Sequence, residues 1–258
     1  MSFWPLFLNE KFSSDITVHN FSPNNFEILK KLKYINLSFI DQKSNSWITN
    51  TIDTLSEFES KTFRSKDLLK SSNFGILGLS NQSIKYKQFK LIRDDYKLSM
   101  IPAWRSTITI TNGVKSSSYQ GELDIFPNKA SLLSISPMIQ NHSKMINNYL
   151  FFINLINEPL NSNHNLVMVD PNNPSIHLET LNVKNNFVNI IKINKRHINS
   201  IYLFASKTLT GIPIFVSEDK FNNISIEHTH PVSQFFVHSN RFLLQRKIKD
   251  EWFKKIFK

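Results

Sequence analysis

The chain has 258 residues and no cysteine, which excludes disulfides, thiolate metal sites and cysteine nucleophiles. Hydrophobic residues make up 40% and aromatic residues 12%, too much apolar surface for a disordered chain. The formal net charge is +11, but Lys supplies 25 of the 31 cations. The Arg enrichment that is typical of nucleic-acid readers is therefore missing.

The sequence shows neither a signal peptide nor a membrane-spanning segment. The opening stretch MSFWPLFLNEKF has an apolar patch that is too short and too interrupted for a signal peptide. The longest apolar runs, such as YLFFINLI at 149–156, fall short of the roughly 20 residues that span a bilayer. We expect a cytoplasmic protein without a transmembrane segment.

The first hundred residues mix helical and strand patterns. Apolar residues recur three or four apart over 22–35, after Ser22 and Pro23, and this predicts a short helix. The same spacing over 45–63 predicts a second, amphipathic helix. Its apolar residues are Ile48, Ile52, Leu55 and Phe58. We therefore expect residues 1–100 to form a mixed α/β region that packs on a core.

Residues 85–97, KYKQFKLIRDDYK, combine lysines with interleaved aromatic residues. Such a stretch can bind single-stranded nucleic acid by stacking, but Asp94 and Asp95 would repel phosphate. A solvated strand is the interpretation that the sequence favours here.

Asn112-Gly113 is the strongest hairpin signal in the chain. Alternating residues lie on both sides of it, in RSTITIT and VKSSSYQ. A two-residue turn of this kind requires positive φ at both positions, which Asn and Gly tolerate.

Short apolar runs follow one another closely after residue 145 and predict a series of strands. They occupy 149–155, 165–170, 176–181, 187–193, 201–206, 212–217 and 224–230. No long helical pattern separates them, which argues against parallel βαβ winding. We predict a mainly β (α+β) protein whose residues 101–239 form an antiparallel β-sandwich or open barrel.

Several enzyme classes lack their sequence signatures. The chain has only five glycines, without a dinucleotide fingerprint or a phosphate-cradling loop. No Gly-x-Ser-x-Gly elbow singles out one serine as a nucleophile.

Residues 240–258 are expected to form a basic amphipathic helix. Its apolar arc would hold Phe242, Ile248, Trp252, Phe253, Ile256 and Phe257. Lys247, Lys254 and Lys258 gather on the opposite side. This side predicts a docking surface for an anionic membrane surface or an acidic partner.

The stretch SIEHTHPV at 225–232 contains the residues that most resemble a catalytic or metal site. In a strand, His228 and His230 share a face with Ile224 and Ile226, whereas Glu227 points the other way. The two imidazoles could act as general base or bind a divalent metal, with structural histidines as the alternative.

A second candidate site surrounds the hairpin. Arg105, Tyr119, Gln120 and Glu122 could together bind a carboxylate, phosphate or sugar. The alternative is an ion pair between Arg105 and Glu122 across the hairpin.

Two classes of function follow from these patterns. In the first, the protein binds a polar or anionic small molecule or glycan near His228 and His230. If it is an enzyme, it also processes this ligand. In the second, it is a non-enzymatic interaction protein that docks through its C-terminal helix to a membrane surface, a protein or nucleic acid.

Overall fold

The computed structural model describes residues 2–21, 32–70, 72–91, 106–121, 131–136, 144–197, 200–228 and 241–258. These residues are mainly β, as predicted, and form two compact units. Unit 1 comprises 1–125 and 156–160, and unit 2 comprises 126–155 and 161–258. The domain boundaries expected at residues 100 and 239 lie outside the described residues and stay predictions.

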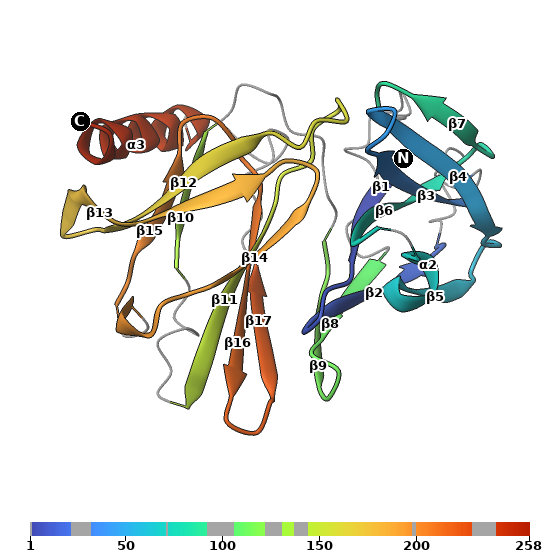
Figure 1. Ribbon diagram of the computed structural model, residues 1–258, viewed down its shortest axis with the longest axis horizontal. Helices are drawn as coiled ribbons and strands as arrows, with labels where there is room; N and C mark the ends of the chain where they lie inside the picture. The colour runs from blue at the N-terminus through green and yellow to red at the C-terminus, as the bar shows by residue number, and fades with distance from the viewer. Residues whose placement is uncertain are drawn as a thin grey trace. The chain divides into compact units, whose positions relative to one another are not determined.

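Unit 1 contains two antiparallel sheets (Figure 1). The first has the order β1 (Ser2–Phe7), β6 (Phe74–Ser80), β3 (Tyr34–Asp41), β4 (Ser46–Thr54) and β7 (Lys85–Gln88). The second has the order β5 (Ser60–Arg64), β2 (Ser13–His19), β8 (Ser106–Thr111) and β9 (Ser116–Tyr119). A single-turn helix, α2 (Ser65–Leu68), follows β5.

One core cluster joins the two sheets of unit 1. Trp4 and Leu77 come from the first sheet and Ile16 and Ile108 from the second, and all four are buried. Each sheet therefore buries apolar side chains against the other.

Unit 2 also contains two antiparallel sheets. One has the order β10 (Leu132–Ile135), β15 (Leu203–Ser206), β12 (Asn163–Asp170) and β13 (Asn173–Lys184). The other has the order β14 (Val188–Lys192), β11 (Met145–Ile153), β16 (Ile212–Asp219) and β17 (Ile224–His228). A 3₁₀ turn, Lys195–His197, and the C-terminal helix α3 (Arg241–Ile256) complete the described part.

The prediction of one sandwich or open barrel after residue 100 is wrong. The strands form four separate sheets of four or five strands, each the size of a propeller blade. Strand β8, which follows residue 100, pairs with the N-terminal strand β2, and β9 pairs with β8 in the same sheet. Alternation identifies a strand but not its neighbour, so the sequence could not predict this division.

The amphipathic helix expected over residues 45–63 is also wrong. Strand β4 occupies 46–54 and β5 begins at Ser60. The β4 segment SWITNTIDT is rich in β-branched Ile and Thr, which favour a pleated strand, and it pairs with β3 along its length. Of the first expected helix, residues 22–31 lie outside the described residues, and Tyr34 and Ile35 begin β3.

The hairpin around Gly113 is confirmed, with its turn one residue later than predicted. Thr111 pairs with Ser116, and the N–H of Asn112 donates to the carbonyl of Lys115 at 3.1 Å. Gly113 has φ +86°, whereas Asn112 has no positive φ. The side-chain oxygen of Asn112 instead accepts from the N–H of Lys115 at 2.9 Å. The turn is thus centred on Gly113 and Val114.

The strands expected after residue 145 are confirmed, as is the helix at the C-terminal end. No helix in the described part of the chain is long and apolar enough to cross a membrane.

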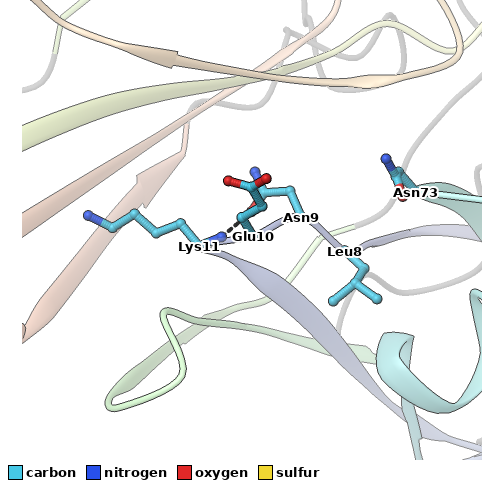
Figure 2. Close-up of a pocket in the computed structure, with 5 residues that line it drawn as sticks. All are labelled: Leu8, Asn9, Glu10, Lys11 and Asn73. Atoms are coloured by element: carbon cyan, nitrogen blue, oxygen red, sulfur yellow. Dashed lines mark hydrogen bonds between the residues drawn. The ribbon is translucent and has the colours of Figure 1, made fainter.

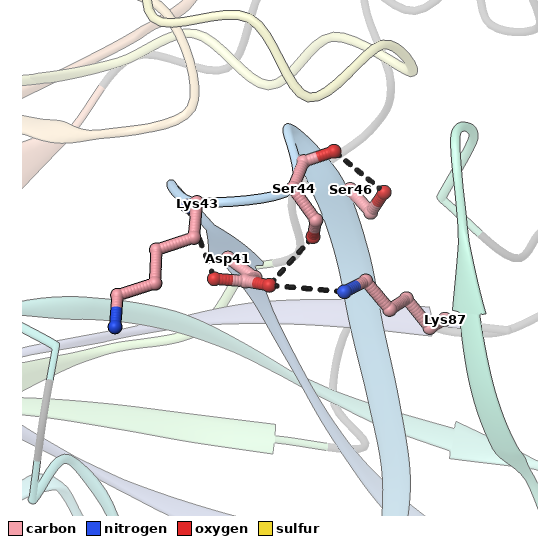
Figure 3. A network of polar contacts seen from close by, with 5 residues as sticks. All are labelled: Asp41, Lys43, Ser44, Ser46 and Lys87. Atoms are coloured by element: carbon pink, nitrogen blue, oxygen red, sulfur yellow. Dashed lines mark hydrogen bonds and ion pairs between the residues drawn. The ribbon is translucent and has the colours of Figure 1, made fainter.

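Asp41 holds the turn between β3 and β4 (Figure 3). Its carboxylate accepts hydrogen bonds from the N–H of Lys43 at 3.1 Å and from the hydroxyl of Ser44 at 2.5 Å. Because β7 pairs with β4, the ammonium of Lys87 lies 3.2 Å from Oδ2 of Asp41. The hydrogen bond from Ser44, together with Lys87, holds the pKa of Asp41 below its ordinary value.

We expect Asp41→Asn to be less stable than the wild type at pH 7. Because the folded-state pKa of Asp41 is lowered, its ionised form contributes stability above the unfolded-state pKa. That contribution is lost as pH falls through the folded-state pKa. Urea unfolding of both proteins from pH 7 into the acid range should show the difference closing. A difference that does not depend on pH would contradict this assignment.

Candidate functional site

The strand that carries His228 has the orientation that the sequence predicted. In β17, Ile224 is buried, Ile226 is half-buried and Glu227 is exposed. The main chain of His228 pairs with Ile214 of β16. The side chain of His228 and the whole of His230 lie outside the described residues, so their catalytic and metal-binding roles stay predictions. Elsewhere in the described chain, no three His, Asp or Glu side chains are grouped to hold a metal ion.

Three other histidines have separate hydrogen-bond partners. His164 bonds to Ser162, Asn185 and Thr208. The Nε2–H of His177 donates to the carbonyl of Ile256 at 2.9 Å. These two imidazoles therefore belong to different local networks.

The third, His197, lies in a small charged cluster. Its Nε2 accepts from Nε of Arg196 at 2.9 Å and lies 3.4 Å from Oε1 of Glu179. The guanidinium of Arg196 is 3.6 Å from the same carboxylate oxygen. Arg196 thus neutralises Glu179 beside a buried imidazole, which is the arrangement of a structural ion pair.

The candidate site at the hairpin is only partly within the described residues. Arg105 and Glu122 lie outside them. Tyr119 is half-buried and packs against the core of unit 1, and burial raises the pKa of its hydroxyl. Gln120 next to it is exposed. Core packing therefore accounts for Tyr119, whereas ligand binding by the four residues remains a prediction.

A pocket of about 510 Å³ lies at the turn between β1 and β2 (Figure 2). It is lined by Leu8, Asn9, Glu10, Lys11 and Asn73. The side-chain oxygen of Asn9 accepts from the N–H of Lys11 at 2.9 Å and of Phe12 at 2.5 Å, so the turn itself uses this polar group. The pocket includes none of the site residues that the sequence predicted.

The apolar side of α3 packs on the sheet that contains β12 and β15. Ile256 is 2% exposed and joins Val167, Val169, Leu203 and Ala205 in one cluster. Trp252, Phe253 and Phe257 are partly buried against the same cluster. Of the predicted apolar arc, Ile248 is 48% exposed, and the side chain of Phe242 lies outside the described residues. The arc thus packs through its C-terminal half.

The part of α3 that does not pack on the sheet exposes five cations, which we call the basic face: Arg246, Lys247, Lys254, Lys255 and Lys258. Two exposed carboxylates, Asp250 and Glu251, interrupt it. Nζ of Lys254 lies 2.8 Å from Oε1 of Glu251, and this hydrogen bond lowers the pKa of Glu251 and raises that of Lys254.

Two further lysines, Lys249 within α3 and Lys207 near its C-terminal end, do not belong to the basic face. Nζ of Lys249 donates to the carbonyl of Ser131 instead of facing water, and burial lowers its pKa. Nζ of Lys207, in the connection after β15, lies 4.7 Å from the centroid of the Phe257 ring. Sequence analysis missed Lys207, because only the fold brings it to the C-terminal end of α3.

Comparison with known proteins identified no similar protein. No family model, no curated protein and no solved structure matches this chain.

We expect Tyr119→Ala to lower the free energy of unfolding by roughly 2 kcal/mol, because truncation leaves a gap against the core of unit 1. Gln120→Ala, at the exposed neighbouring position, should change it by less than about 0.5 kcal/mol. Chemical unfolding of both variants measures the difference. Equal stabilities would show that Tyr119 does not contribute to the core.

Proposed function

We propose that this chain is an interaction protein that binds an acidic surface of a partner protein through the basic face of α3. The observation that carries this proposal is the two-sided use of the helix. The apolar residues of its C-terminal half pack on the sheet that contains β12 and β15, while its five cations remain exposed. Only Lys254 among these five has an ion pair to a carboxylate in the described part of the chain.

Insertion into a membrane surface fits this helix less well. An interfacial helix buries its apolar side among the lipid acyl chains. In α3 that side already packs on β12 and β15, and Ile248 alone is a large exposed hydrophobic residue among its described side chains.

The charge pattern favours a protein over nucleic acid. A phosphate backbone presents charge of one sign, so Asp250 and Glu251 between the cations would be repelled by it. A protein surface can place cations opposite these carboxylates and carboxylates opposite the lysines. The exposed Ile248 adds an apolar contact at the edge of the same surface.

Binding of a polar or anionic small molecule or glycan near His228 and His230 remains the other prediction from the sequence. The side chains that would carry it lie outside the described residues, so its support is still the His-x-His pattern alone.

Replacing Lys247, Lys254 and Lys258 together with Gln tests the proposal. The wild type should bind polyglutamate at low salt, and binding should weaken as salt is added. The triple variant should bind about tenfold more weakly, because each exposed charge contributes up to about 1 kcal/mol. Fluorescence anisotropy with labelled polyglutamate measures both effects.

The matched control replaces Lys66, Lys70 and Lys85, three exposed lysines of unit 1, and changes the net charge equally. It should leave the affinity unchanged. Equal weakening by both triple variants, no binding at low salt, or tighter binding to duplex DNA or phosphatidylserine vesicles would contradict the proposal.

A further inference from the structure

The ends of three neighbouring strands of unit 2 bring together a serine, a histidine, an asparagine and a threonine. Ser162 immediately precedes β12, and His164 is the second residue of this strand. Asn185 directly follows β13, and Thr208 follows β15 by two residues. Since β12 lies between β15 and β13 in the sheet, these four side chains meet at one end of the sheet.

The serine hydroxyl lies within hydrogen-bond distance of the imidazole. Oγ of Ser162 is 3.0 Å from Nε2 of His164. Nδ2 of Asn185 is 2.9 Å from the same Nε2 and 2.7 Å from Oγ of Ser162. Nδ1 of His164 is 3.2 Å from Oγ1 of Thr208.

These partners select one tautomer of His164. The Nδ2 of Asn185 is only a donor, so Nε2 must accept and the ring proton lies on Nδ1, where it donates to Thr208. In this orientation Oδ1 of Asn185 accepts from Nδ2 of Asn154 at 2.6 Å. Asn154 and Asn185 are 2% and 3% exposed, so the base of this network is buried.

The protonation state of His164 suits a general base. Burial lowers the pKa of its imidazole, which favours the neutral ring, and the lone pair on Nε2 is shared between the amide of Asn185 and the hydroxyl of Ser162. Ser162 and Thr208 are exposed, so a molecule in solution can reach the hydroxyl that faces this lone pair.

We propose that Ser162 and His164 are a nucleophile and general base that hydrolyse a small carboxylic ester at this end of the sheet. Oγ of Ser162 attacks the ester carbonyl carbon while its proton passes to Nε2 of His164. The C–O bond to the alcohol breaks, and the alcohol leaves with that proton. Water, deprotonated by His164, then attacks the acyl carbon. The bond from this carbon to Oγ breaks, Oγ takes the proton back from His164, and the acid is released. Asn185 and Thr208 act as positioning residues, because they hold the tautomer that the base requires.

A fluorophosphonate probe on the full chain tests this assignment. Ser162 should be the labelled residue, as peptide mass spectrometry would show, and Ser162→Ala should abolish both labelling and turnover of p-nitrophenyl acetate. His164→Gln should lower the labelling rate at least about 100-fold, the usual contribution of a general base. In the wild type the rate should fall only as pH drops through the lowered pKa of His164.

Ser60 offers a matched control. Its Oγ lies 2.8 Å from Nδ1 of His19, and it is an exposed serine in unit 1. Within the described chain no asparagine or threonine bonds to that imidazole, so Ser60→Ala should leave labelling unchanged. Thr208→Val should keep the fold but lower the rate and shift its pH profile, which a merely structural contact would not do. Labelling absent from Ser162, labelling unaffected by His164→Gln, or turnover equal in Ser162→Ala and wild type would overturn the proposal.

Discussion

Burial of β12 and β15 on both faces is the constraint on which unit 2 depends. Along β12, Leu166 and Met168 enter the core between the two sheets, whereas Val167 and Val169 point to the opposite face. That outer face would be an apolar surface in water without a covering element. Ile256 and its neighbours in α3 supply the cover, and burial of one such side chain contributes about 1.5–3 kcal/mol.

The same packing determines which side of α3 can meet a partner. With Ile256 against the sheet and its carbonyl accepting from His177 on β13, rotation of the helix about its axis is restricted. The lysines are then held outward on a helix whose backbone is already ordered, so binding would order their side chains but not the backbone. A structural role and a docking role are therefore compatible in one helix, since they use different sides of it.

Local features could be predicted from the sequence, and long-range assembly could not. The strands after residue 145, the positive φ of Gly113 and the helix after residue 240 each follow from patterns within a few residues. The prediction of a helix over 45–63 failed because the β-branched Ile and Thr residues of this segment favour a strand, and pairing with β3 selected it. Ser162 and His164 are only two residues apart in the sequence. Asn185 and Thr208 are distant in the sequence and reach His164 only because β13 and β15 flank β12.

Hydrogen exchange of the β12 and β15 amides in Ile256→Asp tests most directly whether α3 is the cover on which unit 2 depends. A carboxylate at this buried position should release the helix, and these amides should then exchange faster. Amides of β3 and β6 in unit 1 should keep their protection, and Lys255→Asp on the exposed side should change neither set. Unchanged exchange of β12 and β15 in Ile256→Asp would contradict this account.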